Sequence, residues 1–137
     1  MEVNNLISST IVSSVLNRDV KQFGKKFLFD NNDDTCWNSD QGEYQHVTVQ
    51  FEKPVCVTDI HVQFQGGFSC KQFDVKLFRD GNEETLCSCY PEDVNVMQQF
   101  KLESVDESSK IKLLFTKHTD FFGRIIIYNL KFYGKVT

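Results

Sequence analysis

An acidic stretch between residues 28 and 40 holds the residue types best suited to binding a cation. The stretch reads Leu-Phe-Asp-Asn-Asn-Asp-Asp-Thr-Cys-Trp-Asn-Ser-Asp and places four carboxylates, a Thr and the only Trp within thirteen residues. Asn and Asp favour turns because their side chains bond to nearby backbone groups. We therefore expect a structured polar loop that one large apolar side chain, Trp37, anchors from below.

A calcium ion is one way to hold these like charges together. Calcium takes about six to eight oxygen ligands, and Asp30, Asp33 or Asp34, and Thr35 offer several of them. The spacing is not that of an EF-hand, because the required Gly and Glu are missing. The alternative is that these side chains cap turns and face water without an ion. The spacing alone leaves both interpretations open.

The residues that enzymes use as nucleophiles and bases form no recognisable motif. His46, His61 and His118 lie in or beside expected strands, with no Ser, Cys or Asp partner at a known spacing. His46 and His61 alternate out of phase with the apolar residues, so we expect them to face solvent. Phosphate-binding Gly loops are absent as well. The sequence therefore predicts a protein that is not an enzyme.

The cysteines and the N-terminus indicate a protein that stays inside the cell. An odd number of cysteines without a signal peptide favours reduced thiols in the nucleus or cytoplasm, and here there are five: Cys36, Cys56, Cys70, Cys87 and Cys89. No apolar run approaches the ~20 residues of a membrane span. Cys87 and Cys89 lack the two-residue gap of zinc-binding pairs. We expect an intracellular, non-secreted protein.

The net charge of −4 and pI near 5.3 bear on the choice of partner. A protein with this balance exerts no long-range attraction on phosphate backbones. We therefore do not expect it to bind nucleic acid directly.

Alternating apolar and polar residues predict strands along almost the whole chain, with one helical turn over 22–29. Pro54 predicts a turn between two strands, and Asp80-Gly81 predicts a hairpin. At 137 residues we expect one domain, 1–137, that is all-β, an antiparallel sandwich or barrel. The expected strands cover residues 11–16, 47–51, 55–64, 73–77, 84–90, 98–102, 111–115 and 124–132.

The acidic stretch also carries a family resemblance. Leu28 to Asn32 and Thr35 to Ser39 are similar to the signature of discoidin, or coagulation-factor type C, domains. The resemblance implies a galactose-binding-like jelly roll, a β-sandwich. It also implies a structural calcium under the loop, held by Asp30, Thr35 and a residue of the last strand. That residue is Asn129 where the family pattern has Glu; its amide oxygen can still coordinate, and Asp33 or Asp34 can compensate for the lost charge.

Longer blocks resemble a family of small intracellular nuclear-receptor-associated proteins of animals. Members of that family are described as repressors that block the DNA binding of an orphan nuclear receptor. The resemblance therefore implies a protein-interaction module whose partner is such a receptor. The blocks are Ser13 to Asn17, Gln22 to Lys26, Thr35 to Gly42, Gln63 to Phe68 and Thr119 to Arg124.

Loop residues near one another in this fold are candidates for a binding rim, because aromatic side chains and Arg are typical anchors of protein interfaces. The alternative is that Phe121 or Phe122 closes the end of the sandwich while Arg124 pairs with Asp120 or Asp40. The predicted rim comprises Trp37, Asn38, Asp40, Gln65, Phe68, Phe121, Phe122 and Arg124.

Two other functions compete with the receptor-binding module. One is a lectin-like domain that binds carbohydrate or another small ligand through the same rim. The other is a subunit of a cytosolic or ciliary transport assembly, where a similar jelly roll occurs. The missing secretion signal and the free thiols favour a protein partner over carbohydrate.

Overall fold

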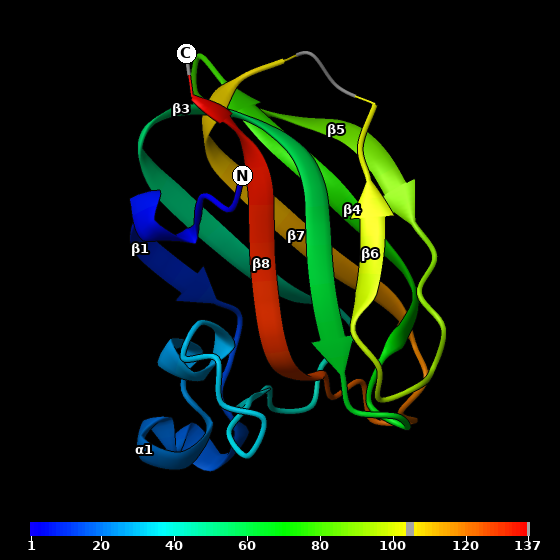
Figure 1. The fold of residues 1–137 in the computed structure, drawn as a ribbon. Coiled ribbons are helices and arrows are strands. Elements are labelled where there is room, and N and C mark those ends of the chain that lie inside the picture. Colours follow the sequence, from blue (N-terminus) through cyan, green and yellow to red (C-terminus); the bar gives the residue numbers. More distant parts are fainter. Residues whose placement is uncertain (104–105, 137) are drawn as a thin grey trace.

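The computed structural model describes residues 1–103 and 106–136 and shows two antiparallel sheets packed face to face (Figure 1). The predicted all-β sandwich is confirmed. One sheet contains, in order, β2 (Trp37–Asn38), β8 (Ile126–Val136), the second half of β3 (Gln45–Phe64) and β6 (Gln98–Lys101). The other contains β1 (Ile7–Val12), the first half of β3, β7 (Ser108–His118), β4 (Cys70–Arg79) and β5 (Asn82–Cys89).

Strand β3 belongs to both sheets, and the turn predicted at Pro54 is wrong. Residues 45–50 pair with β1 and β7, and residues from Val55 onward pair mainly with β8 and β6. Between Gln50 and Val55 the pairing with β7 is interrupted. Pro54 lies exposed in this interval, and because proline lacks a backbone N–H, no donor loses its partner at that residue. A bent strand can pass from one sheet to the other at a corner of a sandwich.

The chain before β2 departs from the predicted strand over 11–16. Strand β1 ends at Val12, and the next two residues, Ser13 and Ser14, donate their hydroxyls to Gln45 Oε1, at 2.5 and 2.9 Å. The helical turn expected over 22–29 is instead two short helices. The helices in the described residues are η1 (Asn4–Leu6), η2 (Leu16–Arg18), α1 (Val20–Phe23) and η3 (Lys25–Leu28). None of them has the length or apolarity needed to cross a membrane.

The hairpin predicted at Asp80-Gly81 is confirmed. Both residues have positive φ, 51° and 80°, and Arg79 pairs with Asn82 across the turn. The predicted last strand begins at Ile126, two residues later than expected, and lies between β2 and β3.

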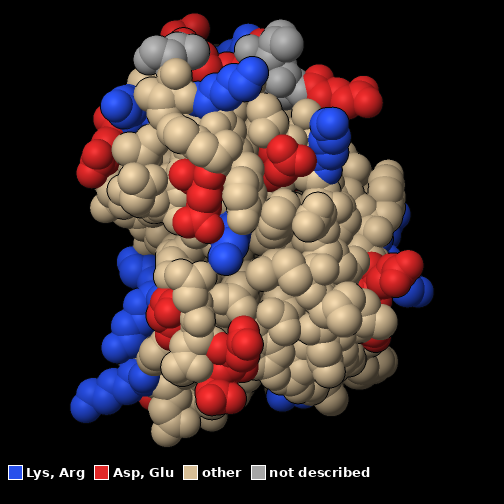
Figure 2. Space-filling model, in the orientation of Figure 1, with Lys and Arg blue, Asp and Glu red and all other residues tan. Residues whose placement is uncertain are grey.

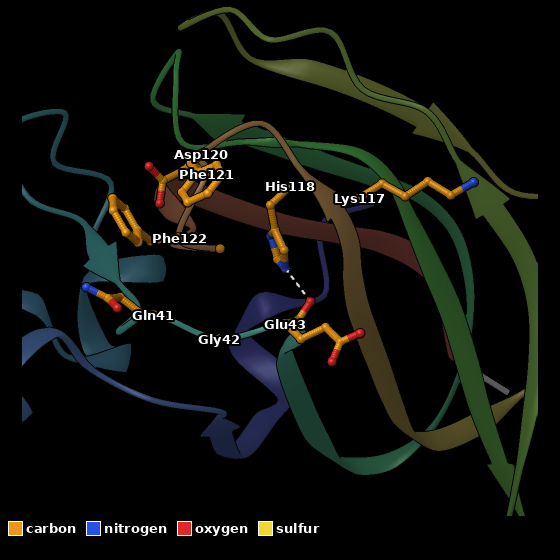
Figure 3. Close-up of a pocket in the computed structure, with 9 residues that line it drawn as sticks. Gln41, Gly42, Glu43, Lys117, His118, Asp120, Phe121 and Phe122 are labelled. Atoms are coloured by element: carbon orange, nitrogen blue, oxygen red, sulfur yellow. Dashed lines mark hydrogen bonds between the residues drawn. The ribbon is translucent and has the colours of Figure 1, made fainter.

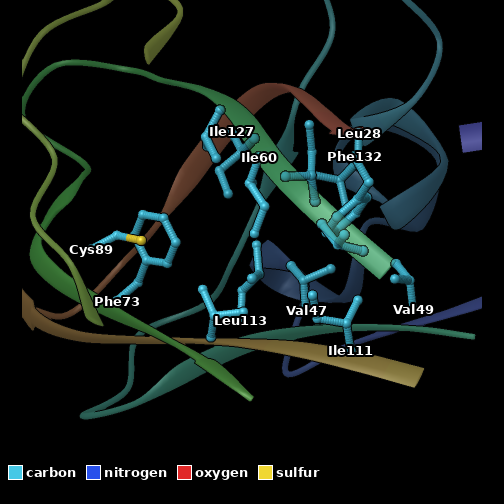
Figure 4. Packing of buried hydrophobic residues seen from close by; sticks show 14 of the residues in the cluster. Leu28, Val47, Val49, Ile60, Phe73, Cys89, Ile111, Leu113, Ile127 and Phe132 are labelled. Atoms are coloured by element: carbon cyan, nitrogen blue, oxygen red, sulfur yellow. The ribbon is translucent and has the colours of Figure 1, made fainter. Parts of the chain in front are cut away.

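Large aromatic side chains fill the space between the sheets. Phe115 lies at the centre, with its ring centroid 6.3 Å from that of Trp37, 6.0 Å from Phe64 and 5.7 Å from Phe73. Figure 4 shows aliphatic residues of both sheets, such as Ile60 and Leu113, meeting in this core. Five of the thirteen Phe residues are buried and give the sandwich a closely packed interior: Phe51, Phe64, Phe73, Phe115 and Phe132.

Candidate functional site

The acidic loop is held by hydrogen bonds among its own residues. Asp30 accepts from the Asn32 N–H at 3.1 Å and from the Thr35 hydroxyl at 2.5 Å. Asn32 in turn accepts from the Asp34 N–H at 2.9 Å. The side chains therefore cap successive turns, which is the ion-free alternative considered from the sequence.

The four predicted calcium ligands lie in two bonded pairs. Thr35 donates to Asp30, while the buried Asn129 donates its amide N–H to Asp33 and to Gln63, both at 3.2 Å. As arranged, these groups do not form a calcium cage, because Asn129 presents hydrogen and not oxygen to Asp33. No cluster of three or more His, Cys, Asp or Glu suited to a metal occurs in the described residues. Asn129 would offer an oxygen ligand only after its amide turned over, and calcium binding stays a prediction.

We expect Asn129→Glu to make stability depend on calcium. Without calcium, the new carboxylate loses both amide bonds and adds a buried negative charge beside Asp33, which costs about 1–3 kcal/mol. With calcium, the added charge strengthens an ion site and restores the melting temperature. Thermal melts in EGTA, calcium and magnesium check this. Equal melting of the variant in EGTA and calcium would contradict it. A fall in the wild-type melting temperature in EGTA is the result that calcium binding predicts.

Trp37 anchors the loop as predicted, but it does not belong to the binding rim. Its side chain is fully buried, and its indole N–H donates to the Ser14 carbonyl at 2.9 Å. Asn38 is buried as well. The rim prediction is wrong for both residues, because Trp37 packs against Phe115 in the core and Asn38 is only 8% exposed in its pairing with β8. Asp40 is half-buried, and its N–H donates to the Ser14 hydroxyl at 3.0 Å.

The loop from Thr119 to Arg124 presents two aromatic rings to solvent. Phe121 is 93% exposed and Phe122 is 54% exposed, so neither closes the end of the sandwich. The rings lie edge to face, with centroids 5.2 Å apart. Large apolar side chains this exposed on a structured loop are unusual unless a partner covers them.

An ion pair braces this loop. Arg124 Nε lies 3.2 Å from Asp120 Oδ2, and the Arg124 N–H donates to the same oxygen at 3.0 Å. Partial burial acts to raise the pKa of Asp120, but the bonds and charge of Arg124 outweigh it and lower that pKa. Asp120 is therefore ionised at neutral pH, and the brace is intact there.

The predicted rim residues of the loop that follows β3, Gln65 and Phe68, lie beside the Asp120–Arg124 ion pair. The Arg124 guanidinium carbon is 4.9 Å from the ring centroid of Phe68, a cation–π contact. Gln65 accepts a hydrogen bond from the Tyr128 hydroxyl at 2.8 Å. The structure thus brings Phe68 and Arg124 together and places Gln65 in the same loop as Phe68.

An open pocket of about 750 Å³ lies behind the two exposed rings (Figure 3). One wall is the loop of Gln41, Gly42 and Glu43, and the other runs from Lys117 to Gly123. His118 Nε2 bonds to the Glu43 carbonyl at 2.8 Å and joins the walls. No local signal could have revealed this pocket, because its walls are about seventy residues apart in sequence.

His46 and His61 lie on the outer faces of the sheets, out of phase with the core residues as predicted, and all three histidines are half-buried. The outer faces of the sheets are covered by neighbouring side chains, and the His61 ring lies 4.3 Å from that of Tyr133. Burial, with the charge of Lys112, lowers the pKa of His46. These positions are consistent with structural roles.

All five cysteines are in the thiol form, and none is joined in a disulfide. Cys87 and Cys89 hydrogen-bond to each other, which lowers the pKa of Cys87 and raises that of Cys89. Burial raises the pKa of Cys70 to about 12. Cys87 is therefore the thiol with the most thiolate character among these three.

Sequence relatives share a single name. Nuclear receptor 2C2-associated protein of Xenopus laevis is 52% identical over 124 residues, 90% of each chain. The Xenopus tropicalis protein is 50% identical over 137 residues, 98% of this chain and 100% of the relative. The human protein is 44% identical over 129 residues, 90% of this chain and 89% of the relative. The chain belongs to the nuclear receptor 2C2-associated protein family. No general family model matches it.

Solved structures with little sequence similarity share the fold of this family member. An F5/8 type C domain from Bacteroides fragilis superposes with a TM-score of 0.80 at 15% identity, over 94% of this chain and 92% of that chain. The family 32 CBM from C. perfringens NanJ, solved with galactose, gives 0.78 at 16% identity over 96% of both chains. The predicted discoidin-like, galactose-binding-like fold is therefore confirmed. The family name is consistent with a protein-interaction role.

Proposed function

We propose that this chain binds a nuclear receptor of the 2C2 type and represses it by blocking its access to DNA. The exposed, edge-to-face pair of Phe121 and Phe122 on a braced loop is the observation that carries the proposal. The name of the relatives supports the choice of partner. A protein with this function acts where the receptor is, in the nucleus or in the cytoplasm before import.

The loop is suited to protein binding because it is already ordered. Gly42 N–H donates to the Phe122 carbonyl at 3.1 Å, and Gln45 Nε2 donates to the Gly123 carbonyl at 3.1 Å. With the Asp120–Arg124 ion pair, these bonds fix the loop before a partner arrives. Preorganised aromatic anchors lose little conformational entropy on binding, and they dominate the affinity of many interfaces.

Repression without DNA contact follows from the charge of the molecule. Its net charge is −4, and Figure 2 shows Asp and Glu side chains spread over the face in view. Such a surface is repelled by phosphate backbones. We infer that the chain covers the receptor and leaves the DNA untouched.

We expect Phe121→Ser to weaken receptor binding by about tenfold or more, because truncating a central aromatic anchor typically has an effect of this size. The melting temperature should stay unchanged, since the ring is 93% exposed. Tyr90→Ser is the matched control, because Tyr90 is 69% exposed on a different loop. Binding of the purified receptor measured by calorimetry checks the affinity.

A DNA mobility-shift assay then tests repression. Wild type and Tyr90→Ser should reduce the amount of receptor bound to its DNA site, and Phe121→Ser should not. Unchanged receptor binding by Phe121→Ser would contradict the proposal. So would tight binding of a glycan that Phe121→Ser abolishes, which would assign the pocket to carbohydrate.

A further inference from the structure

A second surface of the molecule is an apolar groove between β1 and the segment that carries α1. Its volume is about 470 Å³, and it shares no lining residue with the pocket behind Phe121. Ile11 is 57% exposed and Val20 is 61% exposed within it. Concave apolar surface open to water is typical of sites that another apolar group covers. The lining residues are Ile11, Val12, Val15, Val20, Lys21, Gly24, Lys25 and Lys26.

Unusual backbone geometry shapes this groove. Asn17 and Arg18 are both left-handed, with φ of 53° and 57°, and they lie in the turn that leads from β1 to α1. At Gly24 a Cβ atom would lie 2.5 Å from the Val20 carbonyl oxygen, so the close approach of these two residues requires glycine. Left-handed backbone is unfavourable for most residues other than glycine. The rest of the fold therefore has to hold the groove in this shape.

Three lysines rim the groove. Lys25 Nζ donates to the Thr10 carbonyl of β1 at 2.6 Å, and Lys26 Nζ lies 5.0 Å from the ring centroid of Phe27. Within residues 1–103 and 106–136, no carboxylate comes within ion-pair distance of Lys21, Lys25 or Lys26. Figure 2 shows Lys and Arg side chains gathered at the lower left, where Figure 1 places α1. The cluster is therefore a locally positive surface on a protein whose net charge is −4.

We propose that the groove binds an acidic segment of a partner protein. Large apolar side chains of that segment enter between Ile11 and Val20, and its Asp and Glu carboxylates pair with the rim lysines. The apolar lining buries the apolar side chains of the segment, and the lysine charges are complementary to its carboxylates. This surface is separate from the proposed receptor site, so one chain can hold two segments at once.

An anionic membrane fits this surface less well. The exposed carboxylates of Asp30, Asp33 and Asp34 begin four residues after Lys26. A wide sheet of lipid phosphate would meet these charges together with the lysines, whereas a single peptide segment can reach the groove alone. The observations therefore favour a peptide.

A random peptide library displayed on phage tests the proposal against the folded full chain. Enriched peptides should combine Asp or Glu with Leu, Ile, Phe or Trp, and a fluorescent copy should bind more weakly as salt is raised. In two-dimensional NMR spectra, the amide signals of Ile11, Val20 and Gly24 should shift on binding. Liposomes containing phosphatidylserine serve as the comparison ligand.

Matched variants connect binding to the groove. Val20→Asp should lower affinity for the enriched peptide by about tenfold or more, and Val96→Asp, equally exposed at 61%, should leave it unchanged. Lys21→Glu with Lys26→Glu should lower it about tenfold, and Lys71→Glu should not. All of these sites are exposed, so melting temperatures should match.

Several results would overturn the assignment. They are a failure to enrich acidic peptides, NMR shifts confined to residues 119–124, and binding to liposomes but not to peptide. Loss of groove binding with retained receptor binding in Val20→Asp would keep this inference separate from the proposed function.

Discussion

Gly123→Ala should lower the free energy of unfolding by about 2–4 kcal/mol and abolish partner binding through the Phe121 loop. Gly123 has a φ of 79°, which costs Ala about 1–2 kcal/mol. A Cβ atom at this position would also lie 1.9 Å from the Gly42 carbonyl oxygen. The two loops must therefore separate, and the bond from Gly42 N–H to the Phe122 carbonyl breaks. Urea unfolding and receptor calorimetry measure the two effects.

Gly81→Ala is the control for this substitution. Gly81 has nearly the same φ, 80°, but a Cβ atom there would have no described atom within 4 Å, so only the backbone cost applies. The difference between the two variants isolates the steric clash at the pocket. Equal destabilisation, with binding intact in both, would show that the close approach of Gly42 and Gly123 does not order the loop.

Trp37→Ala should lower the free energy of unfolding by about 3–5 kcal/mol, because a fully buried indole is replaced by a cavity. The loss is a large fraction of the total stability of an ordinary domain. The variant also removes the contact with Phe115, whose ring centroid is 6.3 Å away. Urea unfolding monitored by circular dichroism checks the value.

Trp37→Phe separates packing from hydrogen bonding at this position. It keeps an aromatic ring in the core but loses the donor to the Ser14 carbonyl, so we expect a smaller loss than for Ala. A loss below about 1 kcal/mol for Trp37→Ala would mean that the indole does not anchor the acidic loop.

For the calcium prediction, the sequence indicates the loop but not the orientation of the side chains around it. The Asn and Asp residues between Asp30 and Asp40, with Trp37 among them, were sufficient to predict a structured loop. Whether Asn129 offers oxygen or hydrogen to Asp33 depends on a side-chain orientation that links residues about one hundred positions apart. Sequence spacing carries no information on that orientation.

The rim prediction likewise rests partly on residue type and partly on tertiary contacts. Aromatic residues beside Gly and Arg mark the loop of Phe121 and Phe122 by composition. Trp37 has the same residue type as a surface anchor, yet it is fully buried, because its ring packs against Phe115 between the sheets. Residue type indicates that a side chain can act as an anchor, but not whether that side chain faces a partner or the core.

Residue order alone was enough to predict the elements that depend on neighbouring residues: the strand alternation, the turn at Asp80-Gly81 and the polar loop that contains Asp30. These follow from local backbone preferences and side-chain period, which act over a few residues. Three features came to light only with the folded structure: β3 bends through both sheets, Gly42 meets Gly123, and lysines rim an apolar groove. Each of these needs long-range contacts, which form when the two sheets close on a shared core.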